Sequence, residues 1–310
     1  MRVIGPQDLQ VISAPPQALL ERFSCAYELT VRIAGIAMQM RFDDAAVRDK
    51  FAYRYRHHLC DEAAAIAYAC AVYQGSHYFW SDRAAWCWPN ETLPLEAIVL
   101  FADATAMSTL VRSDPGLISF HAAAVGYGGA VAALIGDSTA GKTTTAVACA
   151  RRGMQIYSDE RLLMRHGTLV LPFLRAFNIR QHGAMLLGAD GIADALGERL
   201  AAPAVHGDWA DLSPFEYLPH LRVPKPRPLR AIFLLDGKAE QIKIAELDSL
   251  RASPRLLASI DCMAHARIDR AARVIALLRR LRVFSLTLGR PDATAAAIKS
   301  ILQELGEDAA

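Results

Sequence analysis

The feature that most constrains the fold is residues 136–143, GDSTAGKT, which fit the pattern G-x-x-x-x-G-K-[ST] at every required position. An apolar run, residues 130–135, leads directly into this stretch, and an alanine-rich run from Lys142 to Arg152 leads out of it. This order predicts a buried strand, a tight loop and a helix that stops at Gly153. Strand–loop–helix units of this kind build α/β domains, in which strands and helices alternate.

The residue types in the 136–143 stretch suit the binding of phosphate groups. Gly136 and Gly141 can adopt backbone angles that other residues avoid, so successive amide N–H groups can point toward an anion, assisted by the positive end of the helix. Lys142 can reach the β- and γ-phosphates, and the Thr143 hydroxyl can bind Mg²⁺. We therefore expect ATP and Mg²⁺ as cofactors. The alternative, a tight turn with an exposed lysine, leaves the full pattern unexplained. The expected nucleotide-binding residues are Gly136, Asp137, Ser138, Thr139, Ala140, Gly141, Lys142, Thr143 and Thr144.

A loop of this kind needs an acidic side chain at the end of a neighbouring strand, to hold Mg²⁺ or to take a proton. Asp159 and Glu160 close the apolar run at residues 154–158, and Asp236 closes another at residues 231–235. In a strand–loop–helix–strand unit the next parallel strand ends at the same edge as the loop, which favours Asp159 and Glu160. We expect these two carboxylates and Thr143 to be the metal ligands. Asp236 also reads as the first residue of a turn with Gly237.

The first part of the chain reads as a β-rich α+β region. Residues 27–42 alternate as a hairpin, residues 43–59 have a weak helical period, residues 71–80 read as one strand, and residues 95–111 as a helix. The breaker cluster at residues 113–116 then predicts a boundary. We expect two domains, residues 1–115, suited to binding a substrate or partner, and residues 116–310, an α/β domain with a mixed sheet.

In the second domain the expected elements continue to the end of the chain. The strands are predicted at residues 118–125, 130–135, 154–158, 231–235, 241–245 and 283–288, with a hairpin at 162–170 and helices at 142–152, 254–281 and 291–305. Residues 183–225 are rich in proline and read mostly as loops.

Composition excludes several classes of function. The 34 basic and 32 acidic residues leave a net charge of only +2, which argues against a surface built for nucleic acid. We find neither a signal peptide nor the run of about 18 apolar residues that a membrane helix requires. Six cysteines without C-x-x-C spacing read as reduced thiols. We expect a cytoplasmic protein without a nucleic-acid or membrane partner; a homo-oligomer is compatible with the sequence.

Weaker candidates for function remain open. Residues 57–61, HHLCD, include metal-ligand types but lack a second pair of ligands elsewhere. Arg175 and Arg180 could hold a phosphate or carboxylate by a forked contact, or could be structural. The aromatic segments 209–217 and 73–88 could line an acceptor groove or pack in a core. His121, taken alone, reads as a histidine satisfied within a strand.

Residues 121–160 resemble the catalytic core of the HPr kinase/phosphorylase family and its smaller kinase-like relatives. The matching features are His121, a glycine turn at residues 126–129, the loop at 136–143, Arg152-Gly153, and the acidic pair at 159–160. The resemblance implies a P-loop core with a mixed sheet. It implies that Asp159 is the general base, that Glu160 assists with Mg²⁺ or substrate, and that His121 lies beside the transferred phosphoryl group, with Lys142 on the triphosphate.

This chain departs from the family pattern at three positions. Thr139 stands where the family usually has glycine, Thr144 where the bifunctional enzymes have an acid, and Glu160 where they have a second aspartate. The glycine-rich signature of the phosphorylase reaction is also missing, so the resemblance does not extend to that reaction or to HPr as substrate.

The layout of the chain is similar to kinase-like proteins encoded with ribosomally made peptides, including lasso-peptide kinases. That similarity implies phosphorylation of a serine in a peptide or protein substrate. A small-molecule kinase and a non-catalytic nucleotide-binding regulator are the alternatives.

Overall fold

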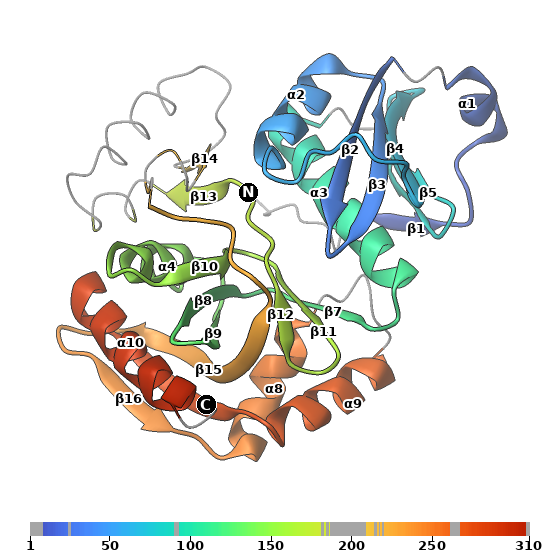
Figure 1. Ribbon diagram of the computed structural model, residues 1–310. Helices are drawn as coiled ribbons and strands as arrows, with labels where there is room; N and C mark the ends of the chain where they lie inside the picture. The colour runs from blue at the N-terminus through green and yellow to red at the C-terminus, as the bar shows by residue number, and fades with distance from the viewer. Residues whose placement is uncertain are drawn as a thin grey trace. The chain divides into compact units, whose positions relative to one another are not determined.

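The computed structural model describes residues 9–23, 26–89, 93–180, 183, 186, 209–213, 216, 218, 220–260 and 267–307 (Figure 1). The chain divides into two compact units, Met1–Pro115 and Gly116–Ala310. Most of the predicted loop region 183–225 lies outside the described residues. Each unit combines helices with a mixed β-sheet, so the protein is of the mixed α/β type.

The first unit is a six-stranded sheet in the order β1-β6-β5-β4-β3-β2, in which only β3 and β4 pair in parallel. Its elements are β1 (Gln10–Ile12), α1 (Gln17–Arg22), β2 (Tyr27–Ile33), β3 (Ile36–Phe42), α2 (Ala45–Arg54), β4 (Ile66–Tyr73), β5 (Ser76–Ser81), β6 (Ala85–Trp88) and α3 (Leu95–Ser113). The predicted hairpin at 27–42 and the helix at 95–111 are confirmed. The weak helical period at 43–59 corresponds to the shorter helix α2.

The prediction of one strand at residues 71–80 is wrong. Gln74 (φ 51°) and Gly75 (φ 75°) adopt left-handed backbone angles and form a two-residue turn, so the chain reverses between β4 and β5. An apolar run on both sides of the turn hid this break. The described cysteines of this unit, Cys60, Cys70 and Cys87, are free thiols, as is Cys149 in the second unit.

The second unit is built on a nine-stranded mixed sheet with the path β10-β8-β9-β15-β12-β11-β7; β17 pairs with β15 and β16. Its elements are β7 (Leu117–Phe120), β8 (Ala123–Tyr127), β9 (Ala130–Ile135), α4 (Lys142–Arg151), β10 (Gln155–Ser158), β11 (Leu162–Arg165), β12 (Leu169–Leu171), β13 (Phe177–Arg180), β14 (Trp209–Leu212), β15 (Arg227–Lys238), β16 (Lys243–Glu246), α8 (Ser249–Ser259), α9 (Arg267–Leu278), β17 (Arg282–Leu288) and α10 (Pro291–Glu307). Strands β9, β15 and β17 run parallel, whereas β8 is antiparallel to both β9 and β10.

Helices cover both faces of this sheet (Figure 1). Side chains of β9 alternate between the faces: Ala132 and Leu134 pack in the cluster that includes α4 and α10, while Val131 and Ala133 pack in the cluster that includes α8 and α9. A strand that is buried on both faces has no polar alternation, which explains its uniformly apolar sequence. Because both faces are covered by helices, the strand ends are the accessible parts of this sheet.

Two predicted elements of this unit are each split in two. The strand expected at 118–125 breaks at His121, whose amide donates to the carbonyl of Ser259 instead of to a sheet partner, at 2.6 Å. The helix expected at 254–281 ends at Ser259 because Ile260 forms a β-bridge with Phe120. The helix beginning at Lys142 is confirmed; Gly153, at φ 79°, follows its last turn.

Candidate functional site

The loop at residues 136–143 connects β9 to α4 and is tightly closed. Gly141 caps α4 in the left-handed conformation (φ 103°), and the Ala140 amide donates to the Asp137 carbonyl at 3.1 Å. A Cβ on Gly136 would lie 2.9 Å from the Cβ of Ala140, and one on Gly141 would lie 2.7 Å from Cδ1 of Leu288. Close packing therefore requires glycine at position 136, and the backbone angle favours glycine at position 141.

Thr139 shares the left-handed conformation, with φ 70°. This conformation is costly for a β-branched residue, and strain of this kind is concentrated at functional sites. It occurs at the position where the resembling family usually has glycine.

Lys142 is the first residue of α4 and is only 8% exposed. Its Nζ donates to the carbonyls of Gly136, at 2.7 Å, and Asp137, at 3.1 Å, so the ammonium group lies over the loop. Burial lowers the pKa of Lys142, and the nearby carboxylates of Asp159 and Glu160 oppose that shift. The loop therefore encloses a positive charge that an anionic ligand can neutralise.

Asp159 follows β10 and is 5% exposed. Its carboxylate accepts a hydrogen bond from the Thr143 hydroxyl, while its Oδ1 has no partner in the described part of the chain. Burial raises the pKa of Asp159 to about 6. A buried oxygen without a partner, next to a hydroxyl, is a suitable donor set for Mg²⁺, which prefers hard oxygen ligands.

The sheet brings Asp159 to the loop by a route that the sequence did not predict. The strand carrying Asp159, β10, is not the neighbour of β9, because antiparallel β8 lies between them. Since β8 is antiparallel to both, β9 and β10 run in the same direction and end at the same edge. The expected edge is therefore correct, and the expected adjacency is wrong.

Asp236 is not brought to the loop by any described contact. It lies inside β15 rather than at the first position of a turn, and its carboxylate accepts from Arg255 and from the Ser285 hydroxyl. Arg255 also donates to the Leu235 carbonyl, at 2.6 Å. These contacts tie Asp236 to helix α8, through Arg255, and to strand β17, through Ser285. Asp236 therefore has a structural role.

Glu160 forms an ion pair with Arg175, whose side chain is 2% exposed. The Arg175 guanidinium also lies 5.9 Å from the centroid of the Phe173 ring. Of the two alternatives for Arg175, the structure shows the structural one, a buried partner for the second acid. The Arg180 side chain lies outside the described residues.

His121 lies at the break between β7 and β8. Loss of hydration, together with the positive charge of Lys142, lowers the pKa of His121 to about 4, and Glu160 opposes the shift. The imidazole is therefore neutral at pH 7. Lys142, Glu160 and Arg175 thus all act on His121 electrostatically.

Sequence reasoning missed two close contacts around the loop. A Cβ on Gly183 would lie 2.8 Å from Oγ1 of Thr144, so this glycine packs against the start of α4. Leu288, at the end of β17, packs against Gly141 from another direction. In the sequence, Gly183 looks like any loop glycine and Leu288 like any core leucine, so no pattern predicts these contacts.

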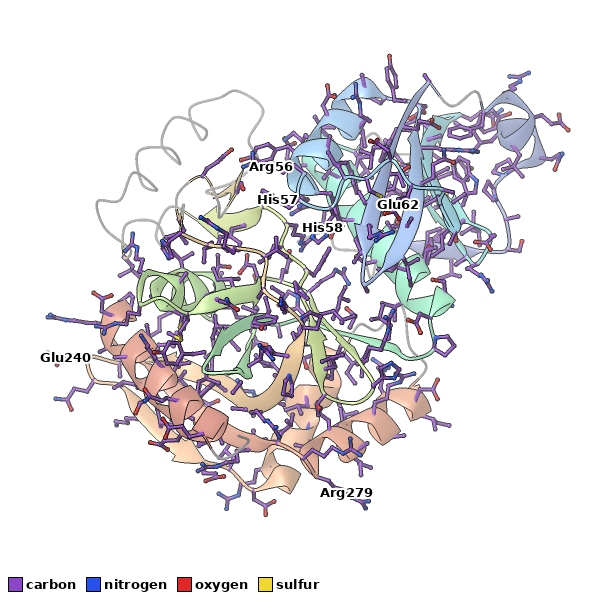
Figure 2. All side chains as sticks on the ribbon, in the orientation of Figure 1. Arg56, His57, His58, Glu62, Glu240 and Arg279 are labelled. Atoms are coloured by element: carbon purple, nitrogen blue, oxygen red, sulfur yellow. The ribbon has the colours of Figure 1, made fainter. Side chains whose placement is uncertain are left out.

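The other sequence candidates lie elsewhere. In the segment after α2, Nδ1 of His58 is 3.1 Å from the Arg32 carbonyl, and Arg56 Nε donates to Nε2 of His57 at 3.3 Å (Figure 2). Among the residues that the structure describes, no three His, Cys, Asp or Glu side chains form a metal-binding group. In the aromatic segment 73–88, Phe79 and Trp86 are fully buried, which favours core packing. The side chains of the segment 209–217 lie almost entirely outside the described residues.

A cavity of about 310 Å³ is lined by the β8–β9 turn, Gly153, Gln155, Tyr157 and Arg227. These residues lie where β9, β10 and β15 begin, whereas the 136–143 loop lies where β9 ends. The cavity is therefore not part of this site.

Scans of the sequence against protein-family models and against curated proteins find no match. Among the described helices, none has the length and apolar character needed to cross a membrane.

Proposed function

We propose that this protein is an ATP- and Mg²⁺-dependent kinase with a P-loop, HPr-kinase-like core, which phosphorylates a hydroxyl group, most readily a serine of a peptide or protein. A cytoplasmic enzyme acting on a ribosomally made precursor peptide fits this proposal. The observation that carries it is the buried carboxylate of Asp159, which accepts from Thr143 at the start of α4 and has one oxygen without a partner.

In the proposed reaction the chain supplies charge and position. Lys142 and the loop amides would neutralise the triphosphate. Thr143 and Asp159 would hold Mg²⁺, which would supply further positive charge next to the phosphate oxygens. Asp159 orients the acceptor hydroxyl and accepts its proton as the γ-phosphoryl group leaves ATP. His121, which is neutral, can donate a hydrogen bond to the transferred group without placing a second cation there.

The ion pair between Glu160 and Arg175 supports this arrangement. Burial raises the pKa of Asp159, and the positive charge of the buried Arg175 is one of the groups that lower it again. Glu160, paired with Arg175, then has its charge partly neutralised, and Asp159 remains the carboxylate that hydrogen-bonds to Thr143.

The experiment is transfer of ³²P from [γ-³²P]ATP to serine-containing peptides, with alanine-substituted peptides as blanks. Asp159→Asn should bind ATP nearly normally and lose transfer, while Asp236→Asn, an acid at the same edge held by Arg255, should keep it. Wild-type transfer by Asp159→Asn would exclude the base assignment. ATP binding without transfer to any peptide would favour the alternatives, a small-molecule kinase or a nucleotide-binding regulator.

A further inference from the structure

The position of Asp159 determines the direction in which a nucleotide must lie along the loop. The strand order β10-β8-β9-β15, with β17 on β15, places Asp159 on one side of β9 and the ends of β15 and β17 on the other. If the γ-phosphate points toward Thr143 and Asp159, as the proposed function requires, the α-phosphate and nucleoside extend toward β15 and β17.

Strand β15 continues past the end of β9 along the loop. Leu234 pairs with Ile135, the last residue of β9, so β15 extends four residues further, to Lys238. Leu235 packs against the loop: its Cβ would lie 3.1 Å from a Cβ on Gly136. The end of β15 therefore forms a wall beside residues 136–141.

An irregularity in β15 turns Lys238 toward the loop. In a regular strand, Asp236 and Lys238 would share one face of the sheet. The register with β17 shifts between Leu235 and Lys238, and Gly237 adopts φ 110° at the shift. Asp236 faces Arg255 of α8, whereas Lys238 lies toward Gly141.

The side chain of Lys238 lies beside the start of α4. Its Cε is 3.9 Å from the position of a Cβ on Gly141, the residue that caps the helix. Its backbone is fixed by pairing with Leu288, and the next amide, that of Ala239, donates to the Leu288 carbonyl at 2.8 Å. Lys238 is exposed, and within the described residues its ammonium group has neither a hydrogen-bond nor an ion-pair partner.

We infer that Lys238 is a second phosphate-binding lysine, whose ammonium group binds the α-phosphate at the nucleoside end of the site. Lys142 then serves the β- and γ-phosphates from inside the loop and Lys238 serves the α-phosphate from β15. This inference rests on the proposed function, because it takes the direction of the nucleotide from Asp159. The neighbouring Glu240, which lies in the segment that connects β15 to β16 (Figure 2), makes no described contact with the loop.

The test is calorimetric titration of the full-length protein with MgATP, MgADP and magnesium pyrophosphate. Lys238→Ala should weaken binding of ATP and ADP about tenfold, the size expected for one charge-assisted hydrogen bond at an exposed site. We expect pyrophosphate to bind next to Lys142, so the affinity of Lys238→Ala for pyrophosphate should change less than about twofold. Lys238→Arg should restore most of the affinity, since the positive charge is kept.

Lys243→Ala is the matched control, because Lys243 is an exposed lysine in the next strand along the chain, β16. It should leave all three affinities unchanged. Unchanged ATP affinity in Lys238→Ala, or an equal loss for pyrophosphate, overturns the role of Lys238 and leaves the proposed function in place. A wild-type protein that binds none of the three ligands removes the proposed function, and this inference with it.

Discussion

Thr143 and Asp159 are joined by a hydrogen bond, although one begins a helix and the other ends a strand that is not a neighbour of β9. Burial raises the pKa of Asp159 from the ordinary 3.8 to about 6, which shows that keeping its carboxylate ionised inside the protein costs free energy. The ionised Asp159 side chain therefore lowers the stability of the folded protein, while its position suits the binding of a ligand at the loop. The stability effect and the binding effect can be measured separately.

The first prediction concerns the stability of Asp159→Asn. The folded pKa of Asp159 lies above the unfolded value, so its contribution to stability is present below pH 3.8 and is lost as the pH rises through about 6. In the ligand-free protein at pH 7, Asn should therefore raise the unfolding free energy of the second unit by about 3 kcal/mol. Thermal melts at pH 7 and pH 4 should show the gain only at pH 7; equal gains would contradict the buried charge.

The second prediction concerns the pH dependence of transfer. A base with a pKa of about 6 is active when deprotonated, so kcat/KM should fall about tenfold per pH unit below that value. Arg175→Met should shift this acid limb to higher pH, because Arg175 lowers the pKa of Asp159. Arg255→Met, which removes the partner of Asp236 instead, should leave the pH profile where it is. Identical profiles for all three proteins would exclude the electrostatic role of Arg175.

The third prediction concerns the strained loop residue Thr139. Thr139→Gly should stabilise the protein by about 1 kcal/mol, because glycine adopts φ 70° without steric cost. Ser138→Gly is the control, since Ser138 does not have a positive φ. This variant should not gain stability. Denaturant melts of the two variants without ligand give the comparison, and loss of stability in Thr139→Gly would contradict the strained conformation.

The fourth prediction concerns the lysine enclosed by the loop. Lys142→Ala should weaken MgATP binding about a hundredfold, because it removes charge-assisted contacts to two phosphates. Turnover should fall as well. Calorimetry on this variant, with Lys243→Ala alongside, provides the measurement. Unchanged binding would contradict the phosphate-binding role of the 136–143 loop.

The elements nearest the loop were predictable because their signals are local. A uniformly apolar run, two glycines and an alanine-rich run specify β9, the loop and α4 without reference to the rest of the chain. The acidic pair after β10 was also found, because strand ends that share a direction also share an edge of the sheet.

The parts that were not predictable depend on distant partners. The break at His121 exists because Ser259 and Ile260 replace the sheet partners there, more than a hundred residues away in sequence. The ion pair of Arg175 with Glu160, and the approach of Lys238 to Gly141, likewise depend on how separate strands meet. No local pattern encodes such contacts.

The antiparallel strand between β9 and β10 sets the spacing of the whole site. Ala123 and Ala124 of β8 are fully buried, one on each face of the sheet. A larger side chain at either position would push a helix layer or a flanking strand outward, and so alter the span between the Asp159 carboxylate and the Thr143 hydroxyl. The distance between these two side chains thus depends on two buried methyl groups, and substitution of either alanine would change it from within the core.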